Sequence, residues 1–231
     1  TLSRSSAASD VYKRQDRQKE LSFLSTALLV AVFLILLILV TQFNAFSSPV
    51  IILTSVVLSL AGVFLGIVIS RNDFVIIMTM IGIISLAGIV VNNAIVLVDY
   101  TNLIRRRKRK ELDIDIKILL SNEEVKEAVI EGGKTRLRPV LLTAITTILG
   151  LFPLASGLNI DFFSLVREWD PKIFFGGDNV IFFKPMSLAI IYGLTFSTFL
   201  TLVVVPTMYY TIYRFKIWLF QKMKWNIKIE L

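Results

Sequence analysis

Four long stretches without a charged side chain constrain this chain more than any other feature of its sequence. They run from Leu21 to Ser70, Phe74 to Val98, Pro139 to Ile160 and Pro185 to Tyr213. A helix that crosses a bilayer needs about 20 predominantly apolar residues, and each stretch reaches that length. Polar residues and a proline between Thr41 and Pro49 divide the first stretch into two spans. The sequence therefore predicts an all-α integral membrane protein with five transmembrane helices.

The regions between the spans differ in character. Residues 1–15 are polar, rich in Ser and Ala and unlike the sequence after them, so we interpret them as a non-native remnant. They lack the apolar region of a signal peptide. The expected helices cover about 21–40, 50–69, 74–100, 139–157 and 185–213. We accordingly divide the chain into residues 1–15, 16–100 with three spans, a linker at 101–138, 139–213 with two spans and a periplasmic loop at 158–185, and a cytoplasmic tail at 214–231.

The linker between the third and fourth spans carries its own signals. Glu111–Leu120 alternates apolar and polar residues, as a strand does. Ser121–Glu124 matches a capping box, and we expect a short helix after it that ends at the glycine pair Gly132-Gly133. Pro139 then suits the first turn of the fourth span. Pro206 lies inside the fifth span and should kink it.

Basic residues are distributed unevenly around the five spans. The net charge is +8, and residues 101–138 hold eleven Lys and Arg, whereas residues 214–231 hold five. The opposite side holds four, Arg71, Arg167, Lys172 and Lys184. Because Lys and Arg are enriched in cytoplasmic loops, the linker and the C-terminus are expected in the cytoplasm. This topology explains the basic balance better than nucleic-acid binding does.

Composition also excludes several kinds of site. The chain has no Cys and no His, which rules out disulfides, thiolate metal sites and the usual proton carrier at neutral pH. Its two glycine pairs lack the strand–turn–helix context that a nucleotide-binding loop needs. No nucleophile is paired with a base, so enzymatic hydrolysis is not supported.

Polar residues inside the third span fall on one helix face. Ser85, Gly88, Asn92 and Asp99 are spaced by three, four and seven residues, and Asn93 lies beside them. Such groups are costly when they face lipid, so this face should contact protein or water. Hydrogen bonding between helices would explain the asparagines without any transport role. Asp99 is also explained by a position at the membrane interface.

The fourth span has a similar stripe. Thr143, Thr147 and Gly150 share a face, and Arg136 lies seven residues before Thr143. The threonines could simply bond to the preceding helical turn, and Arg136 could reach toward lipid phosphates. These explanations and a functional one remain open from spacing alone. Small residues such as Gly62 and Gly66 indicate close packing of helices rather than a site.

Three segments resemble one transporter family. Gly88–Tyr100 resembles the tenth membrane helix of resistance–nodulation–division (RND) efflux transporters of the hydrophobe/amphiphile efflux branch. Arg136–Thr143, followed by Ile148–Leu154, resembles the eleventh helix, and Gly193–Pro206 the twelfth. The resemblance implies helices eight to twelve of a twelve-helix inner-membrane pump. It further implies drug/proton antiport driven by the proton-motive force with no cofactor, a homotrimer, a periplasmic adaptor and an outer-membrane channel.

The resemblance also assigns candidate proton-relay residues. Arg136 and Thr143 match the family's relay arginine and threonine, whereas Asn92 stands where many multidrug members carry a lysine. Asn92 and Asn93 occupy the positions that hold an Asp pair in the first half of these pumps. Since Asn has the shape of Asp but does not titrate, we expect both to donate hydrogen bonds to that pair. Asp99 completes the candidates.

Other functions compete with drug export. An RND relative that exports lipid or protein would share these helices, and a non-transporting membrane scaffold would use the polar stripes for packing alone. Metal-pumping branches fit less well, because their tenth helix carries different polar residues.

Overall fold

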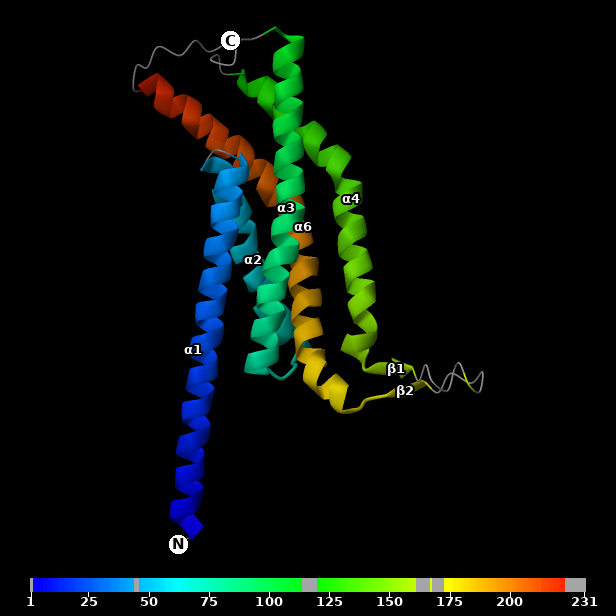
Figure 1. Ribbon diagram of the computed structural model, residues 1–231. Helices are drawn as coiled ribbons and strands as arrows, with labels where there is room; N and C mark the ends of the chain where they lie inside the picture. The colour runs from blue at the N-terminus through cyan, green and yellow to red at the C-terminus, as the bar shows by residue number, and fades with distance from the viewer. Residues whose placement is uncertain (1, 44–45, 114–119, 161–166, 168–172, 223–231) are drawn as a thin grey trace.

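The computed structural model describes residues 2–43, 46–113, 120–160, 167 and 173–222. Five long helices make up most of this part of the chain (Figure 1). Their bounds are α1 Leu2–Phe43, α2 Ser47–Ser70, α3 Ile76–Glu111, α4 Asn122–Ser156 and α6 Asp178–Lys222, with strands β1 Leu158–Ile160 and β2 Ile173–Phe175 between α4 and α6. All five helices are long and apolar enough to cross a membrane, which confirms the predicted all-α fold class.

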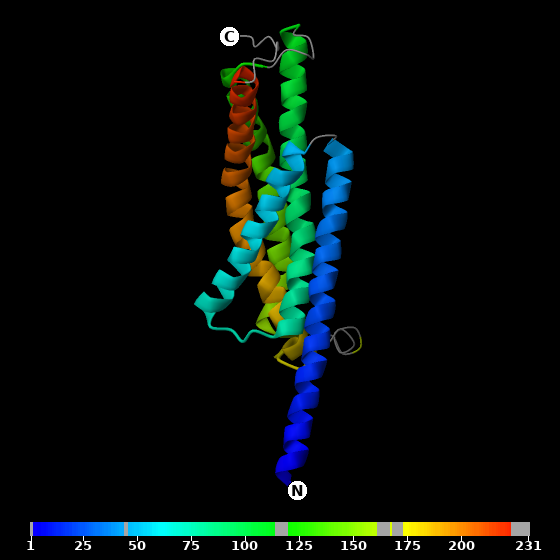
Figure 2. The ribbon, with the colours of Figure 1, turned by 90° about the vertical axis from the view of Figure 1, so that its left-hand side faces the viewer.

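Successive helices run in opposite directions. Figures 1 and 2 show the α2–α3 turn and the strand pair at one end, and the end of α3, the start of α4 and the end of α6 at the other. The N-terminal part of α1 extends beyond the remaining helices. Helix α6 packs against α2, α3 and α4, while α1 packs against α2 and α3. The described ends of the linker and the C-terminal end of α6 therefore lie at one end of the bundle, as an odd number of spans requires.

Glycines allow α2 and α3 to approach α6 closely. A Cβ added to Gly62 would lie 2.5 Å from the Cβ of Phe196, and one added to Gly66 would lie 2.3 Å from the ring of Tyr192. A Cβ on Gly193 would lie 2.1 Å from Leu86 and 2.7 Å from Val63. Side chains of the neighbouring helix fill the space beside each of these glycines, here called a notch. The predicted role of small residues in close packing is therefore confirmed.

The outer surface of the bundle is apolar. Phe23 on α1 is 73% exposed, Val68 on α2 is 75% exposed and Phe199 on α6 is 71% exposed. Water would penalise so many large exposed hydrophobic side chains, whereas lipid would not. This surface is the one that a bilayer-embedded bundle requires.

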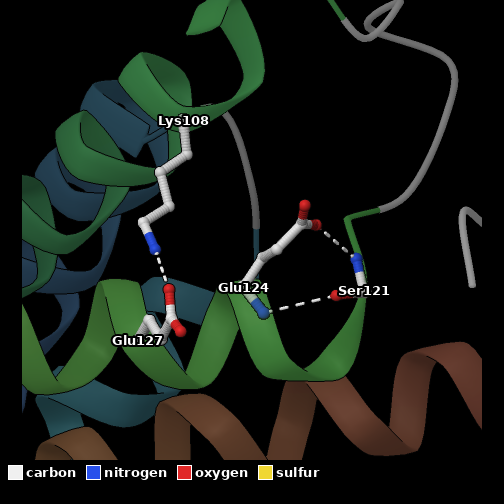
Figure 3. Close-up of polar contacts among 4 residues, drawn as sticks. All are labelled: Lys108, Ser121, Glu124 and Glu127. Atoms are coloured by element: carbon white, nitrogen blue, oxygen red, sulfur yellow. Dashed lines mark hydrogen bonds and ion pairs between the residues drawn. The ribbon is translucent and has the colours of Figure 1, made fainter. Parts of the chain in front are cut away.

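The start of α4 follows the sequence signal closely. Ser121 Oγ accepts a hydrogen bond from the Glu124 backbone N–H, and the Glu124 carboxylate accepts one from the Ser121 N–H (Figure 3). The predicted capping box is thus confirmed. One turn later Glu127 pairs with Lys108 of α3, which ties the start of α4 to the end of α3.

The end of that helix was predicted wrongly. Helix α4 continues through Gly132 and Gly133 to Ser156, and Pro139 lies in its interior rather than in a first turn. Gly132 serves packing instead, since an added Cβ would lie 2.9 Å from the hydroxyl of Thr101 on α3. Because proline cannot donate to the preceding turn, it bends rather than ends this helix, and Figure 1 shows α4 changing direction along its length.

Other boundaries also differ from expectation, including the start of α1 at Leu2 rather than near Leu21 and the end of α6 at Lys222 rather than near Tyr213. Helix α3 continues past Tyr100 to Glu111, and most of the alternating segment after it, residues 114–119, lies outside the described residues. In the expected loop at 158–185, β1 and β2 pair antiparallel with Leu158 opposite Phe175, and α6 already begins at Asp178. Helix α6 contains Pro206 and changes direction toward its C-terminal part, in line with the predicted kink (Figure 1).

Candidate functional site

The polar stripe of α3 lies on an open face of the bundle. Ser85, Gly88, Asn92 and Asp99 are all exposed, whereas the neighbouring Asn93 is 7% exposed. An added Cβ on Gly88 would meet nothing within 4 Å, in contrast to the filled notches of the packing glycines. The predicted stripe therefore exists as one face, and the described part of this chain leaves it uncovered.

Asn93 connects this face to α4. The single hydroxyl proton of Thr143 is shared between two acceptors, Asn93 Oδ1 at 3.4 Å and the carbonyl of Val140 at 3.0 Å. Thr146 and Thr147 donate to carbonyls of their own helix. All three threonine hydroxyls therefore bond to carbonyls of the preceding turn, as the non-functional explanation predicted. Thr143 also contacts Asn93 on the other helix.

Arg136 meets a partner that the sequence reasoning missed. Its guanidinium carbon lies 4.2 Å from the ring centroid of Tyr100 on α3, a cation–π contact. The Nε atom of Arg136 is buried and has no hydrogen-bond partner among the described residues. The half-buried arginine is therefore stacked on the bundle rather than extended away from it.

The two contacts form a ladder between antiparallel helices. Asn93 and Tyr100 are seven residues apart on α3, and Thr143 and Arg136 are seven apart on α4, so each pair spans about 10 Å along its helix. Asn92 and Asp99 repeat the same spacing on the open side of α3. The equal seven-residue spacing on both helices could have predicted Tyr100 as the partner of Arg136. In an antiparallel helix pair, residues that contact each other recur at equal intervals on the two helices.

The site combines groups that hydrogen-bond with one fixed positive charge. The amides of Asn92 and Asn93 and the hydroxyl of Thr143 can donate or accept, but none titrates near neutral pH. Asp99 is exposed on the same face, about two helical turns from Asn92. The face thus presents hydrogen-bond donors and acceptors close to one guanidinium.

Comparison with known proteins identifies the family. A model of the AcrB/AcrD/AcrF family matches residues 6–159. The swarming motility protein SwrC of Bacillus subtilis (strain 168) is 36% identical over 193 residues, which cover 84% of this chain and 15% of SwrC. The multidrug resistance protein MdtC of Erwinia tasmaniensis is 26% identical over 182 residues, covering 79% of this chain and 15% of MdtC.

A solved structure agrees with these relatives. The X-ray crystal structure of a heavy metal efflux pump is similar with a TM-score of 0.58 and 26% identity, over 78% of this chain and 14% of that one. The chain thus spans about 15% of the length of the curated relatives. Its five apolar helices and the family match together make it a multi-pass membrane protein, and the chain belongs to the AcrB/AcrD/AcrF family of RND efflux transporters.

Proposed function

We propose that this chain supplies membrane helices eight to twelve of a proton-driven RND pump that exports hydrophobic or amphiphilic compounds. The observation that carries the proposal is the open polar face of α3 beside α4, with Asn92 exposed and the Asn93–Thr143 and Tyr100–Arg136 contacts next to it. An unpaired amide facing lipid is costly. Helices from elsewhere in the complete transporter would cover this face.

The proposed role of the asparagines is to influence a carboxylate pair that the covering helices provide. Asn93 uses Oδ1 to accept from Thr143, and its amide nitrogen is a hydrogen-bond donor. Hydrogen bonds to an ionised carboxylate favour the charged form. Asn92 and Asn93 would therefore bias when the pair takes up a proton, and the guanidinium of Arg136 would add a positive potential from the same helix pair.

The proposed setting follows the distribution of charge. Arg105–Lys110 at the end of α3 and the C-terminal end of α6 lie at one end of the bundle (Figure 1). By the Lys and Arg excess, that end would face the cytoplasm of a bacterial inner membrane. The family resemblance adds a homotrimer, a periplasmic adaptor, an outer-membrane channel and the proton-motive force as the energy source.

Metal export is the second candidate for the substrate. It is favoured by the similarity to the crystal structure of a heavy metal efflux pump. Both substrate classes would use the same membrane helices, so they are separated by assay. Cells carrying the complete transporter should tolerate amphiphilic dyes if the first proposal is right, and zinc or cobalt salts if the second is right.

The proton-coupling proposal is tested by Asn92→Ala in the complete transporter. Losing a hydrogen bond to a charged group costs about 1.5–3 kcal/mol, so proton-coupled efflux in everted vesicles should fall roughly tenfold or more. Ser85→Ala is the matched control, because Ser85 is exposed on the same face seven residues away. Unchanged efflux in Asn92→Ala would refute the proposed role and favour a scaffold that only packs.

A further inference from the structure

A second polar feature lies away from the α3–α4 face. A cavity of about 260 Å³ opens where the start of α2 meets the ends of α3 and α6. Its polar lining includes Ser47 and Ser48 of α2, Arg105, Arg106 and Arg109 of α3, and Lys216 of α6. Four of these side chains are cations, and the lining residues that the structure describes include no carboxylate. Several cations gathered beside a low-dielectric bundle create a positive local potential, which attracts anions.

One of the cations is held in place by the bundle. Arg105 Nη1 donates to the hydroxyl of Tyr209, which in turn donates to Asn102 Oδ1. The Arg105 guanidinium also lies 4.9 Å from the ring centroid of Tyr213. The Tyr213 hydroxyl donates to the carbonyl of Leu120 at 2.9 Å, which fixes the ring. A charge positioned in advance loses less conformational entropy when it binds a ligand.

The first turn of α2 adds a second positive feature. Phe46, the residue that precedes the helix, makes no capping hydrogen bond with its side chain. The first backbone N–H groups of a helix have no partner within it, and they carry a partial positive charge that favours anions. Ser47 and Ser48 begin this helix and line the cavity, so these donors lie beside the arginines.

The remaining lining is apolar. Phe43, Ile51 and Ile212 complete the wall, so cations and hydrocarbon share one cavity. Helix α2 is a membrane span, which places its first turn at the boundary between hydrocarbon and water. Tyrosines are typical of that depth. An amphipathic anion matches this combination better than a free inorganic ion does.

We propose that this cavity binds the phosphate of an anionic phospholipid headgroup. Arg105 and the start of α2 form its fixed wall, and Arg106, Arg109 and Lys216 add positive charge to the lining. Basic pockets between membrane helices recognise such headgroups through charge-assisted hydrogen bonds to phosphate oxygens. The acyl chains lie along the apolar wall. The site is separate from the proposed proton coupling and does not depend on it.

Lipid binding to the full chain in detergent, measured by native mass spectrometry, tests this site. Arg106→Gln and the double variant Arg106→Gln/Lys216→Gln are compared with Arg107→Gln and Arg107→Gln/Lys110→Gln. The control residues are exposed on α3 and do not line the cavity. We expect the double cavity variant to weaken phosphatidylglycerol binding by about tenfold or more, the matched control to change it less than about twofold, and phosphatidylcholine to bind weakly throughout.

Each contrary outcome has a defined meaning. Equal losses in the cavity and control variants would overturn the site in favour of general surface attraction. Equal binding of phosphatidylglycerol and phosphatidylcholine would overturn the requirement for an anionic headgroup. Inorganic phosphate that displaces phosphatidylglycerol at millimolar concentration would overturn the lipid assignment in favour of a free phosphate. Arg106 is exposed, so the single variant gives the answer even if the double variant loses helix content by circular dichroism.

Discussion

At the scale of single residues, the glycines of this chain divide into two kinds. Side chains of neighbouring helices fill the space beside Gly62, Gly66 and Gly193. A Cβ added to Gly88 or Gly150 would meet nothing within 4 Å. The sequence shows only that all five lie in apolar helices. Whether a glycine packs against another helix depends on which helix lies beside it, and residue spacing within one helix does not predict its neighbour. The open glycines lie on the same side as the polar stripes, which marks that face as incomplete.

Gly193→Ala and Gly88→Ala should therefore differ sharply. The first adds a methyl group that overlaps Leu86 and Val63 and should destabilise the chain by about 1–3 kcal/mol. The second should leave the chain unharmed, since alanine has the higher helix propensity. Unfolding by SDS in mixed micelles, followed by circular dichroism, measures both. Equal stabilities would contradict the close contact at Gly193.

The cap of α4 offers another residue-scale test. Ser121→Ala removes the hydroxyl that accepts from Glu124 N–H and should cost about 1 kcal/mol. Hydrogen exchange should accelerate in the first turns of α4 and stay unchanged at its apolar end. Thr135→Ala is the control, because that hydroxyl bonds only to the carbonyl of Glu131 in its own helix. Equal exchange in both variants would argue against the capping box.

At the scale of elements, the sequence predicted the existence of each span better than its ends. Charge-free length identified all five helices, because the bilayer imposes that length on any spanning helix. The ends were harder, since Gly132-Gly133 and Pro139 are usual signals of a helix boundary. Close packing against Thr101 explains the glycine at 132, and transmembrane helices tolerate an internal proline such as Pro139. Tertiary contacts thus overrode local signals.

The α3–α4 ladder can be measured as an interaction between elements. A double-mutant cycle of Asn93→Ala and Thr143→Ala should give a small coupling, about 0.6 kcal/mol, given the 3.4 Å separation. A second cycle, Tyr100→Leu with Arg136→Gln, should give a larger coupling of about 1–2 kcal/mol for a partly buried cation–π pair. Coupling near zero in both cycles would mean that the two helices do not meet at these residues.

At the scale of the whole molecule, the polar stripes and the open glycines indicate that α3 and α4 need further cover. The sequence alone predicted the stripe, and residue spacing placed Asn92, Asp99 and their neighbours on one face correctly. It did not predict Tyr100 as the partner of Arg136, because a tyrosine near the end of a span ordinarily signals the interface. The cationic cavity also escaped prediction, since it joins residues from three separate helices.

The chain by itself should not move protons. In vesicles with an imposed pH gradient, a pH-sensitive dye should report the background leak, because the proposed carboxylate pair lies on helices outside this chain. The complete transporter in the same vesicles is the positive control. Coupled flux through the chain alone would contradict the assignment of titrating groups to other helices.

The notches between α2 and α6 restrict how these helices move. Phe196 packs against Gly62 and Tyr192 packs against Gly66, so two aromatic side chains of α6 contact glycines one turn apart on α2. Axial sliding would lift both rings out at once, while tilting the two helices together leaves them seated. In any conformational cycle of the transporter, α2 and α6 should therefore move together as one rigid unit.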